Sequence, residues 1–493
     1  MECHNHTSKT TTDDRIGEVP VAIFLKNVEN ATIPVGIGLE LEDDGSKRCC
    51  TEISQLNILD LNDDCLELVF GRFKLEELIT LAKTCTRFSA IAGNVVKRNK
   101  QYFSHWIYMP KPCYFSDFLK TFGYVLEHLT VSHCVEINLI AMHCTNLKEL
   151  TVGHCSLNSL TFEPESLLGF ESLERFSIIW SEISPYFIER LKKLRNLQRL
   201  DLSYSYFLTE SLHNLTNLKH LNLRGTLVTD ECFSCLARNN PDLEQLNISD
   251  CNQLSAKSIQ CIAKYMTKLT YLSWSQWYLN EPYECSTDRQ QIVESRLLKQ
   301  LVIEDNNYGT GAIDYLLRSL AKFDQLEQLE LKNQRIYDYG LICNLANLRI
   351  FKYLYNGSSV NDFEFAKLCA KENFIEVHIS GRELSEEQLV KFIVKNRRLE
   401  LLYVYNFSIR SMDFIISVLK TLKWQSNHQE IVRAGLQKRR LNIHVQDTYI
   451  PIDTIQNLLA ESDHLLKLFF YRNKSSSWEQ KYASYISHDN SSE

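Results

Sequence analysis

The feature that most constrains the fold of this chain is a leucine pattern that recurs along most of its length. The pattern is L-x-x-L-x-L-x-x-C/N, and successive copies start 21 to 29 residues apart. Twelve copies run from LEHLTVSHC at 126–134 to LELLYVYNF at 399–407. A period of this length is typical of a solenoid, in which each unit covers its hydrophobic face only by stacking on its neighbours.

Each copy predicts a strand followed by a helix. The second and third apolar positions are two residues apart, so both point inward from a short strand. Between copies, apolar residues recur at i, i+3, i+4 and i+7, which indicates helices in 229–242, 255–268, 384–398 and 411–424. We therefore expect an α/β fold over 109–472: a leucine-rich-repeat solenoid of the longer, cysteine type, a horseshoe with a parallel concave sheet, convex helices and a degenerate C-terminal cap.

Polar residues at fixed places in the repeat have expected structural roles. Thr229, Ser255 and Ser385 stand where helix N-caps belong. The ninth position of the motif should lie under the turn, where its side chain can bond loop backbone groups. The residues there include Cys134, Cys155, Cys251, Asn306 and Asn356. We therefore expect these cysteines to be structural rather than redox or metal groups.

Bulk properties and motifs exclude several classes of function. A net charge of −7 and a pI of about 6.1 argue against nucleic-acid binding. The chain has no membrane-span pattern and no secretory signal, so we expect it in the cytoplasm, the nucleus or both. The Cys232-x-x-Cys235 pair lacks the second pair of a zinc site, and phosphate loops and nucleophile elbows are absent. We expect no metal, cofactor or catalytic group.

A helical block at 61–88 precedes the repeats. Asn62 is a good N-cap, and apolar residues follow it at helical spacing in three short segments, with Leu68 on another face of the first. Three such helices bury little surface, so surplus apolar side chains indicate that something else covers them. The cover is either the repeat array, with the block as its cap, or a separate protein chain.

Residues 55–106 resemble an F-box, the adaptor-binding motif of SCF ubiquitin ligases. The pattern departs at Asn62, where the family usually has Pro, and at Phe88, where it often has Trp. The matching residues are Leu61, Leu66, Val69, Phe70, Phe73, Leu78, Leu81, Cys85 and Phe88.

The resemblance implies an F-box at 53–108 that binds the adaptor Skp1 and, through it, a cullin. It implies adaptor contacts at six residues, the last two lying closer to the internal helix packing: Leu61, Leu66, Val69, Phe70, Phe73 and Leu78. The segments 1–52 and 473–493 are expected to be disordered.

The F-box and repeats together resemble F-box/leucine-rich-repeat proteins, which implies a non-catalytic substrate receptor of an SCF ligase. The F-box would hold the adaptor, and the repeats would hold an unidentified protein substrate for ubiquitination and degradation. The alternative is a leucine-rich-repeat scaffold that binds protein partners without a ligase role, with the opening block as a cap.

Substrate contacts are expected on outward side chains of the concave strands. Arg175, Arg199 and His220 share the third motif position, and Arg224 lies nearby. Like charges on neighbouring strands would favour an acidic peptide, a phosphosite or a carboxyl terminus. The alternatives are pairing with Asp201 or Glu149, or simple solvation.

Aromatic and acidic residues complete the expected concave surface. The aromatic candidates for binding are Trp180, Tyr204, Tyr355, Tyr403 and Tyr405. Trp274 and Trp277 fall on core registers and are expected to be structural. The middle repeats carry Asp250, Glu304, Asp305 and Glu330, which predicts a change in the sign of the charge along the surface.

Overall fold

The chain divides into two compact units. The computed structural model describes residues 58–98, 112–132, 137–157, 169–207, 209–275, 297–304, 313–320, 324–354, 360–426, 440–460 and 464–470. The segments expected to be disordered lie outside these residues. The first unit comprises Met1–Glu127 with His143–Asn146, and the second, the repeat unit, comprises His128–Met142 with Leu147–Glu493.

The first unit is helical, as its sequence predicts. Helices α2 and α3 pack against α4, and α5 contacts α3 and α4. Asn62 caps α2, since its Oδ1 accepts a hydrogen bond from the Cys65 N–H at 2.8 Å. The elements are η1 (Ile58–Asp60), α2 (Asp63–Phe70), α3 (Leu75–Ala82), α4 (Thr86–Arg98), α5 (Pro112–Phe122) and η3 (Gly123–Val125).

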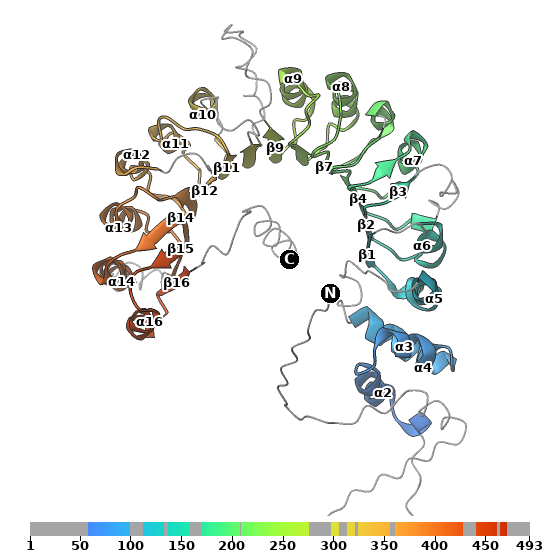
Figure 1. Cartoon of the computed structure of the whole chain (residues 1–493). Coiled ribbons are helices and arrows are strands. Elements are labelled where there is room, and N and C mark those ends of the chain that lie inside the picture. The colour runs from blue at the N-terminus through green and yellow to red at the C-terminus, as the bar shows by residue number, and fades with distance from the viewer. Residues whose placement is uncertain are drawn as a thin grey trace, which may run out of the picture. The chain divides into compact units, whose positions relative to one another are not determined.

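In its described residues, the repeat unit is built on one parallel sheet of fourteen strands, which curves through the unit (Figure 1). Every one of the twelve motifs contributes a strand, and β15 and β16 continue the sheet. In sheet order the strands are β1 (His128–Ser132), β2 (Glu149–Gly153), β4 (Arg175–Ile179), β6 (Arg199–Asp201), β7 (His220–Asn222), β8 (Gln245–Ile248), β9 (Tyr271–Ser275), β10 (Gln300–Glu304), β11 (Gln328–Lys332), β12 (Ile350–Leu354), β13 (Glu376–Ser380), β14 (Leu401–Ile409), β15 (Leu441–Thr448) and β16 (Leu466–Phe470). A separate pair joins β3 (Ser156–Leu157) to β5 (Glu182–Ile183).

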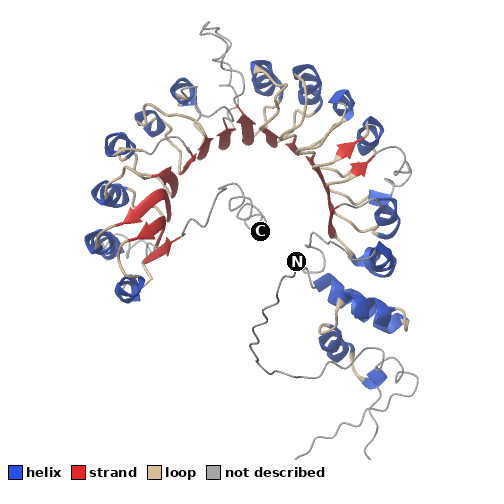
Figure 2. Ribbon diagram, in the orientation of Figure 1, coloured by secondary structure: helices blue, strands red, loops and turns tan. Residues whose placement is uncertain are grey.

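Within this unit, the long sheet lies on the inner side of an arc and the helices lie on its outer side (Figure 2). The four helices predicted from apolar spacing are present, and Thr229, Ser255 and Ser385 cap three of them as expected. The helices are α6 (Ile137–His143), α7 (Pro185–Leu191), η5 (Thr209–Asn214), α8 (Asp230–Asn239), α9 (Ala256–Tyr265), α10 (Asp314–Leu320), α11 (Gly340–Cys343), α12 (Asp362–Leu368), α13 (Glu386–Lys395), α14 (Met412–Ser426) and α16 (Ile452–Ala460).

Strand register places the motif leucines in the core. Leu200 pairs with Leu221, which pairs with Leu246, and all three side chains are buried. Outward side chains alternate with them, so β1, β4 and β12 each present one buried and one more accessible face. Trp274 occupies a core register beside Ile303 but is only partly buried, which departs from the expected core role. Trp277 lies outside the described residues.

The ninth motif position forms a hydrogen-bonded line under the turns. Cys251 Sγ donates to the Leu223 carbonyl at 3.0 Å, and Cys155 Sγ donates to the Gly153 carbonyl at 3.1 Å. The Cys155 N–H also donates to Ser181 Oγ, the ninth-position side chain of the next repeat, at 3.1 Å. Burial raises the pKa of Cys251 to about 11, so its thiol stays protonated at neutral pH. The structural role is confirmed for Cys155 and Cys251; Cys134, Asn306 and Asn356 lie outside the described residues.

Buried asparagines after two helices bond the backbone of the preceding repeat. Asn240 Oδ1 accepts from the Leu218 N–H at 3.0 Å, and its Nδ2 donates to the Leu215 carbonyl at 2.9 Å. Asn396 follows α13 and accepts from the Phe374 N–H at 3.1 Å. These contacts pair backbone groups that no strand or helix satisfies.

Replacing Asn240 should therefore destabilise the repeat unit. We expect Asn240→Ala to lower the free energy of unfolding by about 3 kcal/mol, because a buried N–H and a buried carbonyl lose their partner. The exposed neighbour Asn239 is a matched control, and Asn239→Ala should cost less than about 1 kcal/mol. Urea unfolding followed by circular dichroism checks both; equal losses in the two variants would contradict this role.

Candidate functional site

Three of the residues expected to contact an adaptor lie inside the first unit. The side chains of Leu66, Phe70 and Leu78 are 0% exposed. Phe70 packs edge-to-face on Phe88 of α4, with ring centroids 5.2 Å apart. Adaptor contact does not fit this burial, because a partner cannot touch these side chains unless the helices separate. They hold the three helices together instead.

The exposed apolar surface of this unit lies on the other side of α2. Leu68 is 75% exposed and Val69 is 38% exposed. Cys65, also exposed, precedes them by one helical turn, so the three side chains form one apolar strip. Leu61 and Phe73 are partly exposed, and their contact with an adaptor stays a prediction, as does that of Val69. The sequence signal for Leu68 was its place on a second face of the helix.

Arg87 holds the segment before α2 in place. Its Nη1 and Nη2 donate to the carbonyl oxygens of Leu59 and Leu61, each at 2.6 Å. Its Nε donates to Asp63 Oδ1 at 2.9 Å. Leu59, which is 46% exposed, and Leu61 are therefore fixed against α4 rather than free to move.

On the inner face of the repeat unit, the three predicted basic residues lie in one row. Arg175 pairs in register with Arg199, which pairs with His220. Glu149 neutralises Arg175 through a 3.1 Å ion pair, which is one of the expected alternatives. Burial lowers the pKa of His220, and although a hydrogen bond with Gln245 raises it, the net shift is downward, so His220 is mainly neutral at pH 7.

Arg199 is therefore the uncompensated charge of this row. Its side chain is exposed, and no ion pair involves it within the described part of the chain. Asp201, the other expected partner, instead accepts hydrogen bonds from the Ser203 N–H and from Asn222 Nδ2, both at 2.8 Å.

A second row lies at the carboxyl ends of the same strands. The eighth motif position adopts positive φ at His154 (54°), Trp180 (51°), Tyr204 (56°) and Gly225 (68°). The rings of Trp180 and Tyr204 stack at 4.3 Å with an interplanar angle of 7°, and the His154 ring stacks on Trp180 at 6.3 Å. Gly225 makes room for this stack, since a Cβ there would lie 2.4 Å from the Tyr204 ring.

Arg224 closes this stack and is bound to acidic residues. Its guanidinium lies 5.7 Å from the Tyr204 ring centroid. It pairs with Asp250 at 2.9 Å and with Glu304 at 3.1 Å. Burial disfavours its charge, but the two carboxylates outweigh burial and raise its pKa. Arg224 is thus already neutralised, and it is a support for Tyr204 rather than an open anion site.

The acidic residues of the middle repeats are likewise paired. Asp250 and Glu304 bind Arg224, and Glu330 binds Lys332 at 3.2 Å. Asp305 lies outside the described residues. The expected acidic stretch of the surface therefore carries far less net charge than its sequence indicates.

Four stacked rings run across the last strands, and only Tyr403 among them was predicted. His378, Tyr403, His444 and Phe469 share the fifth position of their repeats, which is the signal that would have revealed them. Their successive centroids are 4.2, 4.0 and 4.3 Å apart. We call this set the ring ladder.

Tyr405 is not the exposed aromatic residue that its sequence position predicts. It is 8% exposed, at a shift of register in β14 after Val404, and its hydroxyl bonds His378 Nδ1 at 3.0 Å. Its expected substrate contact does not fit this burial. Tyr355 lies outside the described residues.

Charges beside the ring ladder are internally balanced. Glu376 bonds His378 Nε2 at 2.7 Å and Lys352 Nζ at 2.9 Å. Burial alone would raise the pKa of Glu376, but these two partners outweigh it and lower the pKa to about 2. Burial lowers the pKa of His378. Burial also lowers the pKa of His444, to about 4, and the neighbouring His378 adds to this shift.

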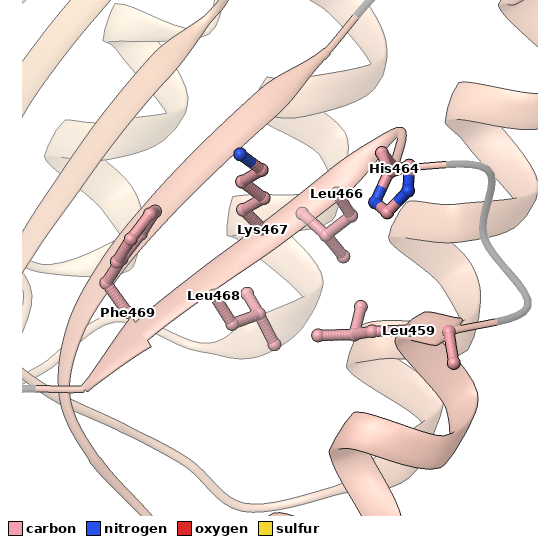
Figure 3. Close-up of a pocket in the computed structure, with 7 residues that line it drawn as sticks. Leu459, His464, Leu466, Lys467, Leu468 and Phe469 are labelled. Atoms are coloured by element: carbon pink, nitrogen blue, oxygen red, sulfur yellow. The ribbon is translucent and has the colours of Figure 1, made fainter. Parts of the chain in front are cut away.

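The end of the sheet carries a hollow of about 310 Å³ between α16 and β16. It is lined mainly by aliphatic side chains, and Leu459 and Leu468 point toward one another across it (Figure 3). It brings together no set of polar groups that would orient a small molecule.

No metal or membrane site emerges from the part of the chain that the structure describes. Within it, no group of three or more histidine, cysteine or acidic side chains is placed to hold a metal ion. None of its helices is long and apolar enough to cross a membrane.

The ring ladder makes stability depend on pH. A histidine whose pKa is lowered by folding takes up its proton more readily in the unfolded chain. The free energy of unfolding therefore falls as pH drops from about 6.5 towards 4. His444→Phe keeps a stacking ring but removes this titration, while His378, Glu376 and Lys352 remain.

We expect the melting temperature of His444→Phe to fall less than that of the wild type between pH 7 and pH 5. Thermal denaturation at both pH values measures this difference. Equal losses in the two proteins would show that His444 does not carry the effect.

Comparisons with known proteins identify one part of the chain. Residues 58–100 match the F-box domain. No curated protein matches the chain. Two similar solved structures come from Listeria monocytogenes str. 4b F2365. An internalin has 17% identity over 73% of this chain and 83% of that one, at a TM-score of 0.37. Internalin C2 has 14% identity over 53% of this chain and 83% of its own, at a TM-score of 0.24. At these TM-scores the likeness supports no assignment; the chain carries an F-box domain ahead of its parallel repeat sheet.

Proposed function

We propose that this chain is the substrate-recognition subunit of an SCF-type ubiquitin ligase. In this role the first unit binds Skp1, and through it a cullin, while the inner face of the repeat unit binds the protein to be ubiquitinated. The F-box match at residues 58–100 carries the proposal. The exposed apolar strip on α2 supports it, because such a strip on a small helical unit favours coverage by another protein.

The proposed role needs no catalytic group in the chain itself. A receptor holds a lysine of the substrate near the ubiquitin thioester of the conjugating enzyme, and so raises the effective concentration of the two reactants. The remaining candidate is a protein-binding scaffold without a ligase role, in which the helical unit serves the repeats only. Skp1 binding separates the two.

The apolar strip supplies the decisive variant. We expect Leu68→Ser with Val69→Ser to weaken Skp1 binding about thirtyfold, because roughly 2 kcal/mol of apolar burial at the interface is lost. Both side chains are exposed, so the variant should fold like the wild type. Isothermal titration of the purified full chain with Skp1, with circular dichroism of each protein, measures both properties.

Two controls keep this test specific. Phe363→Ser removes a side chain that is 72% exposed on α12 of the repeat unit, and it should leave Skp1 binding unchanged. Leu66→Ala with Phe70→Ala removes buried side chains and should unfold the first unit, at about 2–5 kcal/mol for each change. A folded wild type that ignores Skp1 would reject the ligase role and favour the scaffold.

A further inference from the structure

We propose that the inner face at β4 and β6 binds an extended peptide segment that carries an anionic group and, about five residues away, an apolar side chain. The anionic group lies against Arg199, and the apolar side chain lies against Trp180. This inference rests on the proposed function, since it names the substrate class that the repeat unit recruits.

Charge determines the first part of the inference. The row that crosses β1, β2, β4, β6 and β7 contains Glu149 between His128 and Arg175, at 3.1 Å from each. With Arg175 neutralised and His220 neutral, one positive charge is left, on the exposed Arg199. A single anionic group complements this row, and a guanidinium can bind it through two parallel hydrogen bonds.

Trp180 determines the second part. The residue is 52% exposed although its ring stacks on Tyr204. A bulky side chain in the left-handed region is unusual, whereas Asn, Asp or Gly would be ordinary there. The equivalent positions are Gly225, Asp250, Asn333 and Asn406 in four other repeats, and His154 and Tyr204 in the two repeats that flank Trp180. A half-exposed tryptophan held between the rings of Tyr204 and His154 has the properties of a binding anchor.

The spacing follows from strand geometry. Trp180 comes five residues after Arg175, whose register partner is Arg199. At about 3.3 Å per residue the two rows are roughly 16 Å apart, which an extended peptide spans in about five residues. On β4 and β6, where the peptide lies, no outward side chain between the rows is longer than isoleucine, so a backbone can pass close to the sheet. These side chains are Ser177, Ile179, Asp201 and Ser203.

Peptide selection on the purified full chain tests this inference. A phage-displayed library of random dodecapeptides is the probe, with wild type, Arg199→Ser and Trp180→Ala as targets. We expect wild type to enrich peptides with an acidic and an apolar residue about five positions apart. Arg199→Ser should lose only the acidic preference, and Trp180→Ala only the apolar one.

The matched control is Arg318→Ser, which removes an exposed arginine from α10 on the outer side of the repeat unit. It should select the same peptides as wild type. Enriched peptides that lack the acidic–apolar pair, or a preference that survives Arg199→Ser, would overturn the inference. So would a failure to enrich any peptide above an unrelated protein. Equal urea midpoints of all variants establish that folding is intact.

Affinities then identify the anionic group. Fluorescence anisotropy with the selected peptide should show about tenfold weaker binding after its acidic residue is changed to Gln, or after Arg199→Ser. Trp180→Ala should weaken binding about thirtyfold. A phosphoserine peptide that binds more tightly than the glutamate peptide assigns the site to a phosphorylated substrate, and equal or weaker binding assigns it to a carboxylate. An unchanged affinity after Arg199→Ser would overturn the charge assignment.

Skp1 titration of the same variants separates this inference from the proposed function. Arg199 and Trp180 belong to the repeat unit, so both variants should bind Skp1 like the wild type. Peptide selection without Skp1 binding would leave the peptide site standing and reject the ligase role. Skp1 binding without peptide selection would support the ligase role and reject the peptide site.

Discussion

The repeat unit depends on one constraint: neighbouring strands must pair in register. Each short strand buries its leucines only because the next strand places its own leucines beside them, as in the Leu200, Leu221 and Leu246 row. A slip of one residue would turn every buried side chain outward. The same register also aligns the outward residues into rows, so the arrangement that builds the core also builds the surface.

The strands, the caps and the rows could be predicted from the sequence because they depend on short-range pattern. Motif spacing located twelve strands, and Asn62, Thr229, Ser255 and Ser385 cap helices as expected. The predictions that were wrong concern side-chain burial and charge pairing, which depend on contacts between residues far apart in the chain. Arg224 is neutralised partly by Glu304, eighty residues later. Helical spacing placed Leu66 and Phe70 on one face of α2 and Leu68 on another. Only the packing on α4 shows that the first face is buried and that Leu68 is exposed.

On the inner face, ion pairs and ring stacking within the repeat unit leave only a few of the predicted binding residues available to a partner. Of the four basic candidates on the inner face, Arg175 and Arg224 are bound to carboxylates and His220 is neutral, which leaves Arg199. Of the aromatic candidates, Tyr405 is buried and Tyr403 belongs to the ring ladder, whereas Trp180 keeps half of its surface open. Recognition through a few open groups beside a rigid sheet is consistent with the proposed receptor role, because a preformed site loses little conformational entropy when it binds.

The central claim is that the chain has two separate binding surfaces, of which the apolar strip on α2 is the one for the adaptor. Amide hydrogen exchange of the full chain with and without saturating Skp1 tests this directly. The account predicts slower exchange in the α2 segment, Asp63–Phe70, and no change in the strands of the repeat unit. Unchanged exchange in α2, or protection confined to the strands, would contradict it.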